Sequence, residues 1–559
     1  MTVEEKYSLW LEKTAGNEEL NGELRAIAGD EEAIRDRFYR ELAFGTGGLR
    51  GVLGAGSNRM NVYTVARATQ GVAQCLLREN AQPSVALAYD SRRCSRLFAE
   101  TAAAVFAANG VRVWIYPHLM PTPALSFAVR ALGCDGGAVI TASHNPAEYN
   151  GYKVYGADGC QITTVLAERM QSAIDALDPF ADVRFGDFAE LSESGMIRQL
   201  DETVTEAYLA AVSRTSVLPQ NISRAVSVVY TPLNGAGISC VPRALAENGF
   251  TDVYIPPEQA QPDGAFPTCP YPNPEVREAL QVGLRTAAER GSELLLATDP
   301  DCDRVGIAVK NGGSYTLLTG NETGVLLFDF ICRMRLAAGT MPVSPIAVKT
   351  IVTTPMAEPI AAHYGVELRN VLTGFKYIGE QLGRLERAGE EARYIFGFEE
   401  SYGYLTGGYV RDKDAVNASL LICEMFAWYK AQGITLIEAL NALYDRYGAY
   451  RSRLVNFAFA GESGAADMRR RMKALRDTPP TELAGLPVLS VTDYLSDDTG
   501  LPRADVLRYR LPNGREIVVR PSGTEPKLKL YLTAAEKSAE ESLAALDEME
   551  ADFRRRIGA

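Results

Sequence analysis

The feature that most constrains the fold is a repeated alternation of helical segments with short apolar runs. In the first part of the chain, helical patterns at 61–79, 95–109 and 122–132 lead into apolar runs at 84–89, 111–116 and 137–141. Short apolar runs bounded by turns and separated by helices are typical of buried strands in mainly parallel sheets. The opening part of the chain is therefore predicted to be an α/β unit.

The same rhythm restarts twice and then changes character near residue 447. Apolar runs recur at 225–230, 293–297, 345–350 and 393–398. The rest of the chain predicts strands at 451–459, 515–520 and 527–533 and helices at 463–475 and 534–557. With 559 residues the chain is too long for one core. We expect a first α/β domain with a helical extension over 3–45, two further α/β domains and a C-terminal α+β domain, at 1–205, 206–320, 321–446 and 447–559.

Composition excludes several classes of protein. The chain is 47% hydrophobic and 23% charged, and no apolar run reaches the roughly 18–20 residues that cross a bilayer. Its first residues show no signal-peptide pattern, so a cytoplasmic location without membrane contact is expected. The net charge of −13 argues against a nucleic-acid partner. Nine cysteines without a CxxC pair argue against a zinc site or a redox dithiol.

A serine follows the apolar run at 137–141, in the segment Thr141-Ala142-Ser143-His144-Asn145-Pro146. Lys153 follows ten residues later. One interpretation is a serine that carries a phosphoryl group with an acid/base nearby, and the other is a capping serine in a loop. A Ser–His–Asp hydrolase fits poorly, because His144 is adjacent in sequence and the GxSxG elbow is absent.

Three carboxylates at alternate positions occur in Asp299-Pro300-Asp301-Cys302-Asp303-Arg304. Carboxylates in a loop after a strand can converge on one hard cation, and oxygen ligands suit Mg²⁺. An EF-hand is excluded, because Arg304 stands where Gly is needed and Lys310 where Glu is needed. The alternative is an acidic solvated turn.

Two further segments have the chemistry of ligand binding. Gly397-Phe398-Glu399-Glu400-Ser401-Tyr402-Gly403 offers a carboxylate and a hydroxyl suited to sugar hydroxyls, although a plain loop fits as well. Arg520-Pro521-Ser522-Gly523-Thr524-Glu525-Pro526-Lys527 combines cations, hydroxyls and backbone N–H groups suited to phosphate, the alternative being a connecting turn. The Gly-rich stretch at 45–51 could be a hinge or, through Arg50, could face a phosphate. Neither a Walker A sequence nor a GxGxxG follows a strand, which disfavours kinase and nicotinamide chemistry.

These four segments, in this order, resemble the α-D-phosphohexomutase superfamily over nearly the whole chain. The resemblance implies three α/β/α domains with mixed, mainly parallel sheets and a C-terminal α+β domain around a central cleft. It implies a phosphoserine at Ser143 that, with Asp299, Asp301 and Asp303, holds Mg²⁺. Glu399 and Ser401 would bind sugar hydroxyls, and the substrate phosphate would be held by Arg520, Ser522, Gly523, Thr524 and Lys527.

Within the superfamily, GFEESYGY resembles the phosphoglucomutase type and departs from the GEMSGH and GEQSGH of other types. Thr373-Gly374-Phe375-Lys376 is similar to the loop of that type which touches sugar and phosphate, so Thr373 and Lys376 are expected to bind substrate. The subgroup also contains phosphopentomutases and glucose-1,6-bisphosphate synthases.

The expected reaction interconverts glucose 1-phosphate and glucose 6-phosphate through glucose 1,6-bisphosphate. Lys153 is expected to be the general acid/base, and Arg304 to balance charge. His144 is expected to contact the phosphoryl group or to orient the loop. Alternatives are a phosphopentomutase, a phosphomannomutase, a hexose-bisphosphate synthase, a metal-dependent phosphatase and a silent sugar-phosphate-binding protein. The sequence leaves open whether the protein is a monomer or a dimer.

Overall fold

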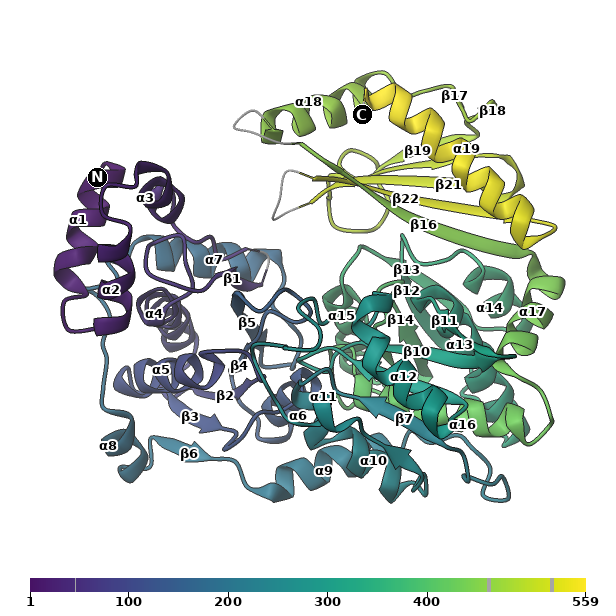
Figure 1. The fold of residues 1–559 in the computed structure, drawn as a ribbon, viewed down its shortest axis with the longest axis horizontal. Helices are drawn as coiled ribbons and strands as arrows, with labels where there is room; N and C mark the ends of the chain where they lie inside the picture. Colours follow the sequence, from purple (N-terminus) through teal and green to yellow (C-terminus); the bar gives the residue numbers. More distant parts are fainter. Residues whose placement is uncertain (46, 460–463, 523–526, 559) are drawn as a thin grey trace. The chain divides into compact units, whose positions relative to one another are not determined.

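The computed structural model describes residues 1–45, 47–459, 464–522 and 527–558 (Figure 1), and in it the chain divides into two compact units. The first unit consists of Met1–Leu318, Gly379–Ala392 and Gly403–Ala427. The second consists of Thr319–Ile378, Arg393–Tyr402 and Trp428–Ala559. Among the described residues, no helix combines the length and the apolar character that a membrane-spanning segment needs.

The first unit begins with three short helices instead of one long helical segment. They are α1 (Val3–Lys13), α2 (Glu18–Ala26) and α3 (Glu31–Phe38). Each starts at a side chain that accepts a backbone N–H: Thr2, Asn17 and Asp30. Trp10 and Phe38 pack edge to face in the small core that these helices form.

A six-stranded sheet follows, in the order β1-β5-β4-β2-β3-β6. Its strands are β1 (Gly48–Val52), β2 (Ser84–Tyr89), β3 (Arg112–Ile115), β4 (Gly136–Ile140), β5 (Tyr149–Gly156) and β6 (Ile197–Gln199). Its helices are α4 (Val62–Glu79), α5 (Ser95–Ala108), α6 (Thr122–Ala131), α7 (Thr164–Asp175), α8 (Phe188–Glu193) and α9 (Glu202–Ser213). Strand β2 is buried at every position, as expected for a central strand between helical layers.

The β1–β5 edge of this sheet was not predicted from the sequence, although its antiparallel strands agree with the expected mixed, mainly parallel sheet. Strand β5 runs antiparallel to both β4 and β1, and it contains Lys153. The hinge interpretation of the Gly-rich stretch at 45–51 is wrong for residues 48–51, which lie in β1. A Cβ at Gly48 would lie 1.9 Å from the Tyr152 carbonyl oxygen, so only glycine allows this close pairing.

The second sheet of the first unit has five strands in the order β11-β10-β9-β7-β8. They are β7 (Val228–Thr231), β8 (Val253–Tyr254), β9 (Leu294–Thr298), β10 (Val305–Asn311) and β11 (Ser314–Leu318). Strands β7, β8 and β9 are parallel, whereas β10 and β11 add an antiparallel edge. The helices of this part are α10 (Val241–Glu247), α11 (Pro257–Ala260) and α12 (Gln281–Arg290). Strand β15 (Tyr404–Leu405) and most of α15 (Phe375–Arg387) and α16 (Ala415–Lys430) also belong to the first unit.

The second unit contains a parallel arrangement followed by an antiparallel sheet. Strands β13 (Glu367–Val371) and β14 (Tyr394–Phe398) both pair in parallel with β12 (Ile346–Thr350). The helices of this part are α13 (Gly320–Ala337), α14 (Ala357–Tyr364) and α17 (Leu436–Tyr447). The antiparallel sheet has the order β16-β22-β21-β20-β19.

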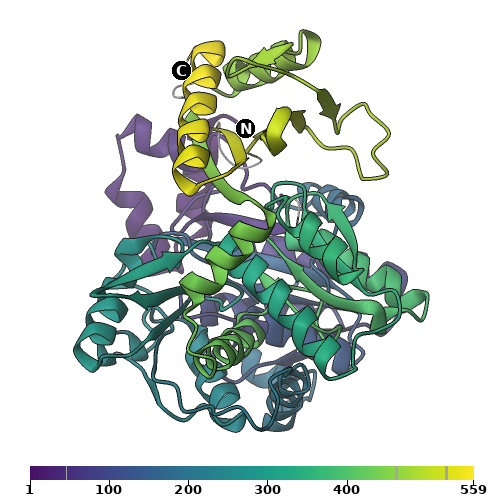
Figure 2. The same cartoon turned by 90° about the vertical axis from the view of Figure 1, so that its right-hand side faces the viewer.

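The antiparallel sheet consists of β16 (Ala449–Ala458), β19 (Ser490–Asp493), β20 (Leu507–Arg510), β21 (Glu516–Pro521) and β22 (Lys527–Glu536). It is accompanied by α18 (Gly464–Asp477) and by a small hairpin, β17 (Glu482–Leu483) and β18 (Leu486–Pro487). Helix α19 (Ala539–Ile557) packs along β16 and β22 (Figure 1 and Figure 2). The predicted start of this helix at 534 is wrong, because β22 continues to Glu536 and Ser538 caps the helix.

Candidate active site

Ser143 lies in a tight loop directly after β4, in the first unit. Its backbone is in the left-handed region, with φ at 51°, and its side chain is buried. The Ser143 N–H donates to Thr141 Oγ1 at 2.8 Å, which closes the turn. The Ser143 hydroxyl donates to Asp299 Oδ2 at 2.6 Å, so the two loops singled out from the sequence meet.

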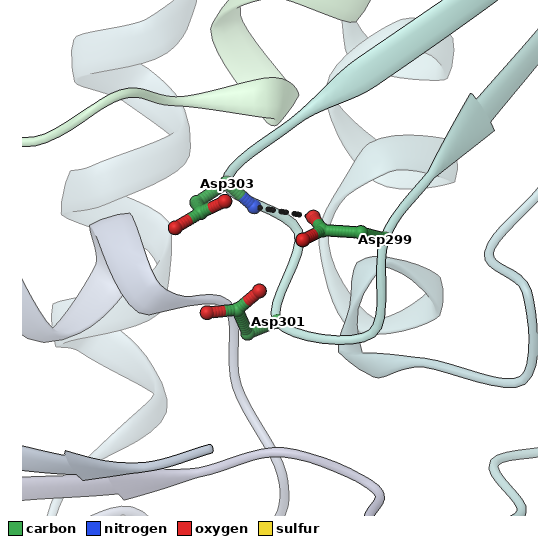
Figure 3. Close-up of side chains that lie close together, drawn as sticks. All are labelled: Asp299, Asp301 and Asp303. Atoms are coloured by element: carbon green, nitrogen blue, oxygen red, sulfur yellow. Dashed lines mark hydrogen bonds between the residues drawn. The ribbon is translucent and has the colours of Figure 1, made fainter. Parts of the chain in front are cut away.

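The three carboxylates of the predicted metal loop converge in the structure. Asp299, Asp301 and Asp303 follow β9 and are buried, and one oxygen from each lies within 4.8 Å of the others. Figure 3 shows the three side chains turned toward a common centre, with the Asp303 N–H donating to Asp299 Oδ1 at 3.1 Å. The solvated-turn alternative is therefore wrong.

The oxygen chemistry of this cluster fits a hard divalent cation. Asp301 Oδ1 and Asp303 Oδ1 are buried and have no hydrogen-bond partner among the described residues. A buried carboxylate oxygen without a partner is costly, and a metal ion is one of the few groups that can satisfy it. Three carboxylates with only oxygen donors suit Mg²⁺ better than softer metals.

Two lysines reach the same carboxylates. Lys153 Nζ, from β5, lies 2.8 Å from Asp301 Oδ2 and 3.4 Å from Asp303 Oδ2. Lys413 Nζ lies 2.7 Å from Asp303 Oδ2. Lys413 is not predicted from the sequence, because it lies 110 residues downstream of Asp303 and its neighbours form no recognised motif.

The charges of this cluster shift one another's pKa values. The pKa of Asp299 lies well above its ordinary value, because burial disfavours its charge and Asp301 and Asp303 repel it. Burial is the largest influence on the pKa of Asp301 and acts to raise it, but the charges of Lys153 and Lys413 and the hydrogen bonds from Asp299 and Lys153 together lower that pKa. The pKa of Lys153 is raised, since its ion pairs outweigh the burial of its ammonium group. Repulsion among the carboxylates is what a divalent cation would relieve.

The other predicted groups of the first unit surround Ser143. His144 Nδ1 lies 3.3 Å from Ser143 Oγ, and burial together with the charges of Arg304 and Arg50 lowers the pKa of this imidazole well below its usual value. Arg50, on β1, donates to Asn145 Oδ1 at 3.2 Å. Arg304 donates to Glu275 Oε1 at 2.9 Å, and its Nε lies 3.8 Å from Asp303 Oδ1.

The predicted sugar-binding residues belong to the second unit. Glu399 and Ser401 follow β14, and Glu399 is buried. The Glu400 carboxylate between them accepts the hydroxyls of Thr350 and Thr353, each at 3.1 Å. This contact ties the turn after β14 to the turn after β12.

The remaining predicted residues also lie in the second unit. Thr373 follows β13, and Lys376 is in the first turn of α15, with its Nζ 5.4 Å from the centre of the Tyr377 ring. Arg520 is in β21. The Ser522 N–H donates to the Lys527 carbonyl at 2.7 Å, and this hydrogen bond joins the two ends of the β21–β22 connection. Gly523 and Thr524 lie outside the described residues.

Family models match four consecutive segments of the chain. Residues 41–179, 206–313 and 319–447 match the phosphoglucomutase/phosphomannomutase alpha/beta/alpha domains I, II and III. Residues 454–551 match the C-terminal domain of the same family.

Individual relatives agree with these matches. The phosphoglucomutase of Staphylococcus saprophyticus is 33% identical over 547 residues, covering 96% of this chain and 97% of that protein. The open form of pp63/parafusin, a phosphoglucomutase from Paramecium, has a TM-score of 0.70 at 17% identity, covering 93% of this chain and 96% of that one. The N-acetylphosphoglucosamine mutase of Aspergillus fumigatus, solved with GlcNAc-6P and magnesium, has a TM-score of 0.51 at 14% identity, covering 93% and 96% of the two chains. The sequence relatives support a phosphohexomutase, and the chain belongs to the phosphoglucomutase/phosphomannomutase family.

Proposed function

We propose that the protein is a phosphoglucomutase that interconverts glucose 1-phosphate and glucose 6-phosphate, with Ser143 as its phosphoryl carrier. The observation that carries this proposal is the 2.6 Å contact between Ser143 Oγ and Asp299, a member of the buried carboxylate triad. A serine oxygen beside a cluster that fits a divalent cation is suited to receiving and releasing a phosphoryl group. The relatives named phosphoglucomutase support glucose phosphates as the substrates.

We propose that Asp299, Asp301 and Asp303 hold Mg²⁺, together with the phosphoryl group on Ser143. Two observations support this: the unpartnered buried oxygens of Asp301 and Asp303, and the magnesium in the A. fumigatus mutase structure. Bound there, Mg²⁺ would offset the charge that keeps Lys153 protonated and would stabilise negative charge on the phosphoryl oxygens.

The transfer itself exchanges a proton for a phosphoryl group. The free hydroxyl of the sugar phosphate attacks phosphorus, the bond from phosphorus to Ser143 Oγ breaks, and the hydroxyl proton ends on the oxygen that leaves. We assign the carriage of this proton to Lys153 Nζ, which lies beside the triad. In the second half-reaction, glucose 1,6-bisphosphate returns its other phosphoryl group to Ser143 by the same steps in reverse.

The other residues are assigned to substrate recognition or to support of the loop. His144, which contacts Ser143 Oγ and whose lowered pKa favours the neutral imidazole, is proposed to contact the phosphoryl group. One guanidinium group can donate two parallel hydrogen bonds to the oxygens of a phosphate. Arg50 and Arg304 are therefore proposed to contact phosphate. We assign the sugar hydroxyls to Glu399, Ser401, Thr373 and Lys376, and the distal phosphate to Arg520, Ser522, Gly523, Thr524 and Lys527.

The proposed function is tested by a coupled mutase assay in the presence of glucose 1,6-bisphosphate. Glucose 1-phosphate, mannose 1-phosphate and ribose 1-phosphate are compared as substrates, and glucose 1-phosphate is expected to turn over fastest. A preference for ribose 1-phosphate would identify a phosphopentomutase instead. Stoichiometric release of inorganic phosphate would identify a phosphatase.

The role of Ser143 is tested by Ser143→Ala, with Ser172→Ala on the exposed side of α7 as the matched control. Ser143→Ala should abolish turnover, because no oxygen remains to carry the phosphoryl group. Intact-mass measurement should find one added phosphate on the wild-type protein and on Ser172→Ala, lost on addition of substrate, and none on Ser143→Ala. Activity near the wild-type level in Ser143→Ala would refute the carrier role.

A further inference from the structure

Arg92 is a buried arginine that the proposed mechanism does not use. It follows β2 in the segment before α5, and its side chain is completely buried. Burying a guanidinium is costly unless hydrogen bonds and a counter-charge satisfy it. Its partners therefore indicate what the residue stabilises.

The two terminal nitrogens of Arg92 bind the loop that carries Ser143. Nη1 donates to the carbonyls of Pro146 at 2.8 Å and Tyr149 at 3.0 Å. Nη2 donates to the carbonyls of Ser143 at 2.5 Å and of Asn145. One planar group thus collects four backbone carbonyls from a stretch of seven residues, from Ser143 to Tyr149.

Asp90 couples the arginine to the start of the same loop. Asp90 Oδ2 lies 3.5 Å from Arg92 Nε, and Oδ1 accepts the Arg92 N–H at 2.9 Å. Asp90 Oδ2 also accepts the hydroxyl of Thr141 at 2.6 Å, and Thr141 Oγ1 in turn accepts the Ser143 N–H at 2.8 Å. The backbone on both sides of Ser143 is therefore connected to the Asp90–Arg92 pair.

The opposite side of the arginine is closed by a segment from the Pro-rich stretch. The Phe266 ring, also buried, lies with its centre 5.0 Å from Arg92 Cζ. Gly264 forms a β-bridge with Arg92, and a Cβ there would lie 2.3 Å from the Arg93 backbone nitrogen. The Phe266 ring therefore covers the guanidinium, and the bridge to Gly264 holds the Arg92 backbone.

The conformation of Ser143 needs such support. A residue other than glycine at φ 51° is unfavourable and persists only where its surroundings hold it. We propose that Arg92 is a positioning residue, which holds the Ser143 loop in this conformation and keeps Ser143 Oγ within reach of Asp299. An effect of Arg92 on catalysis rests on the proposed function, whereas its role in holding the Ser143 loop does not.

The proposal predicts a specific kinetic pattern for Arg92→Met, which keeps the length of the side chain but removes its donors. Because a misplacement of about 1 Å can cost about 100-fold in rate, kcat should fall about 100-fold. KM for glucose 1-phosphate should stay close to the wild-type value, since the groups proposed to bind the sugar and the distal phosphate lie elsewhere. Arg92→Lys restores the charge but not the fork of donors, so its kcat should lie between those of Arg92→Met and the wild type.

Arg93→Met is the matched control, because Arg93 is the neighbouring arginine and is exposed. It should leave kcat, KM and the melting temperature at their wild-type values. Hydrogen exchange measured by mass spectrometry supplies a readout that needs no activity. In Arg92→Met and Arg92→Lys, amides of the peptide spanning 141–150 should exchange faster, while the peptide containing β9 and the Asp loop should change little.

The outcomes separate the two proposals. Wild-type kcat or unchanged exchange at 141–150 in a folded Arg92→Met protein would overturn the role of Arg92. If Arg92→Met does not fold, Arg92→Lys decides by the same two measurements. A wild-type protein without mutase activity would refute the proposed function, and the exchange experiment would still test whether Arg92 holds the loop.

Discussion

The charge of single residues decides what the carboxylate cluster can do. Two of the three aspartates, Asp301 and Asp303, lie at ion-pair distance from Lys153, and Asp303 also from Lys413. Arg304 lies beside Asp303. The two lysines reduce the repulsion among the three carboxylates. The oxygens of Asp301 and Asp303 that have no hydrogen-bond partner among the described residues remain available to a cation. Removal of either lysine would therefore change the charge of the cation site as well as any proton transfer.

Another buried charged residue is Lys349, which lies in the second unit near the end of β12. It donates to the carbonyls of Thr353 at 3.1 Å and Thr350 at 3.4 Å. Burial lowers its pKa to about 8, because the charged form is disfavoured in the interior. The charged groups that face it from neighbouring elements are Glu358, Glu400, Arg508 and Glu516.

This lowered pKa predicts a pH-dependent stability. The folded protein binds the Lys349 proton with a pKa of about 8 and the unfolded chain with one near 10.5, so the unfolded state binds more protons between these values. The unfolding free energy should therefore rise with pH over this window. The difference between these two pKa values corresponds to about 3 kcal/mol of unfolding free energy, which the folded protein lacks below pH 8 and regains above pH 10.5.

Urea unfolding of the wild type and of Lys349→Met at pH 7, 9 and 10.5 measures this effect. The stability of the wild type relative to Lys349→Met should increase with pH by about 3 kcal/mol. Lys473→Met, at an exposed lysine of α18, should show a difference that does not change with pH. A difference in stability between the wild type and Lys349→Met that stays constant with pH would contradict the lowered pKa of Lys349.

At the scale of elements, the edge of the first sheet carries residues that are proposed to act in catalysis and phosphate binding. Strand β5 holds Lys153, and β1 pairs beside it with Gly48 opposite Lys153. The approach is so close that a Cβ at Gly48 would overlap the Tyr152 carbonyl. Glycine at this position is thus a condition for β1, and β1 also presents Arg50.

Two Gly→Ala substitutions should have opposite effects. Gly48→Ala should destabilise the protein by about 2 kcal/mol or more, since the strands must separate, and should lower activity by displacing Lys153. Gly22→Ala, inside α2 with no atom within 4 Å of the new Cβ, should stabilise by about 0.5–1 kcal/mol and leave activity unchanged. Melting temperatures and the mutase assay check both. A neutral Gly48→Ala would show that β1 and β5 can move apart without cost.

At the scale of the molecule, the candidate cation site lies wholly within the first unit. Its ligands follow β9 of the five-stranded sheet, and they contact Ser143 and Lys153 of the six-stranded sheet. A cation held there would join the two sheets of that unit. The four domain ranges expected at 1–205, 206–320, 321–446 and 447–559 stay a prediction.

Mg²⁺ should therefore stabilise the folded protein through the triad. At a hundredfold excess over Kd, binding to the native state alone contributes roughly 2.7 kcal/mol, which raises the melting temperature. EDTA should reverse the shift. Differential scanning calorimetry should place the shift in the transition of the first unit.

Asp301→Asn tests whether the triad is responsible. It should remove most of the Mg²⁺-induced shift and the Mg²⁺-dependence of activity, because one charged ligand is lost. Asp252→Asn, at an exposed aspartate, is the matched control and should respond as the wild type does. An equal shift in Asp301→Asn would mean that the ion stabilises the protein from another site.

Much of the fold could be predicted from local pattern. The alternation of helices with apolar runs predicted β2, β4, β9, β12 and β14 to within a few residues, because buried strands are contiguous in sequence. Strand β5 was missed, since polar residues such as Asn150 and Lys153 interrupt its apolar pattern. The C-terminal helix was placed too early because the apolar residues at the end of β22 suit either state.

The sequence by itself determined the chemistry of this protein: a serine after one strand, three aspartates after another, and two candidate binding loops, each contiguous in the chain. Only the tertiary structure decided that Ser143 lies against Asp299, that Lys413 joins the triad and that Arg92 holds the serine loop. The physical reason is distance along the chain. Residue type and short-range spacing are recorded locally, whereas contacts between residues 51 to 156 positions apart exist only once the sheets have packed.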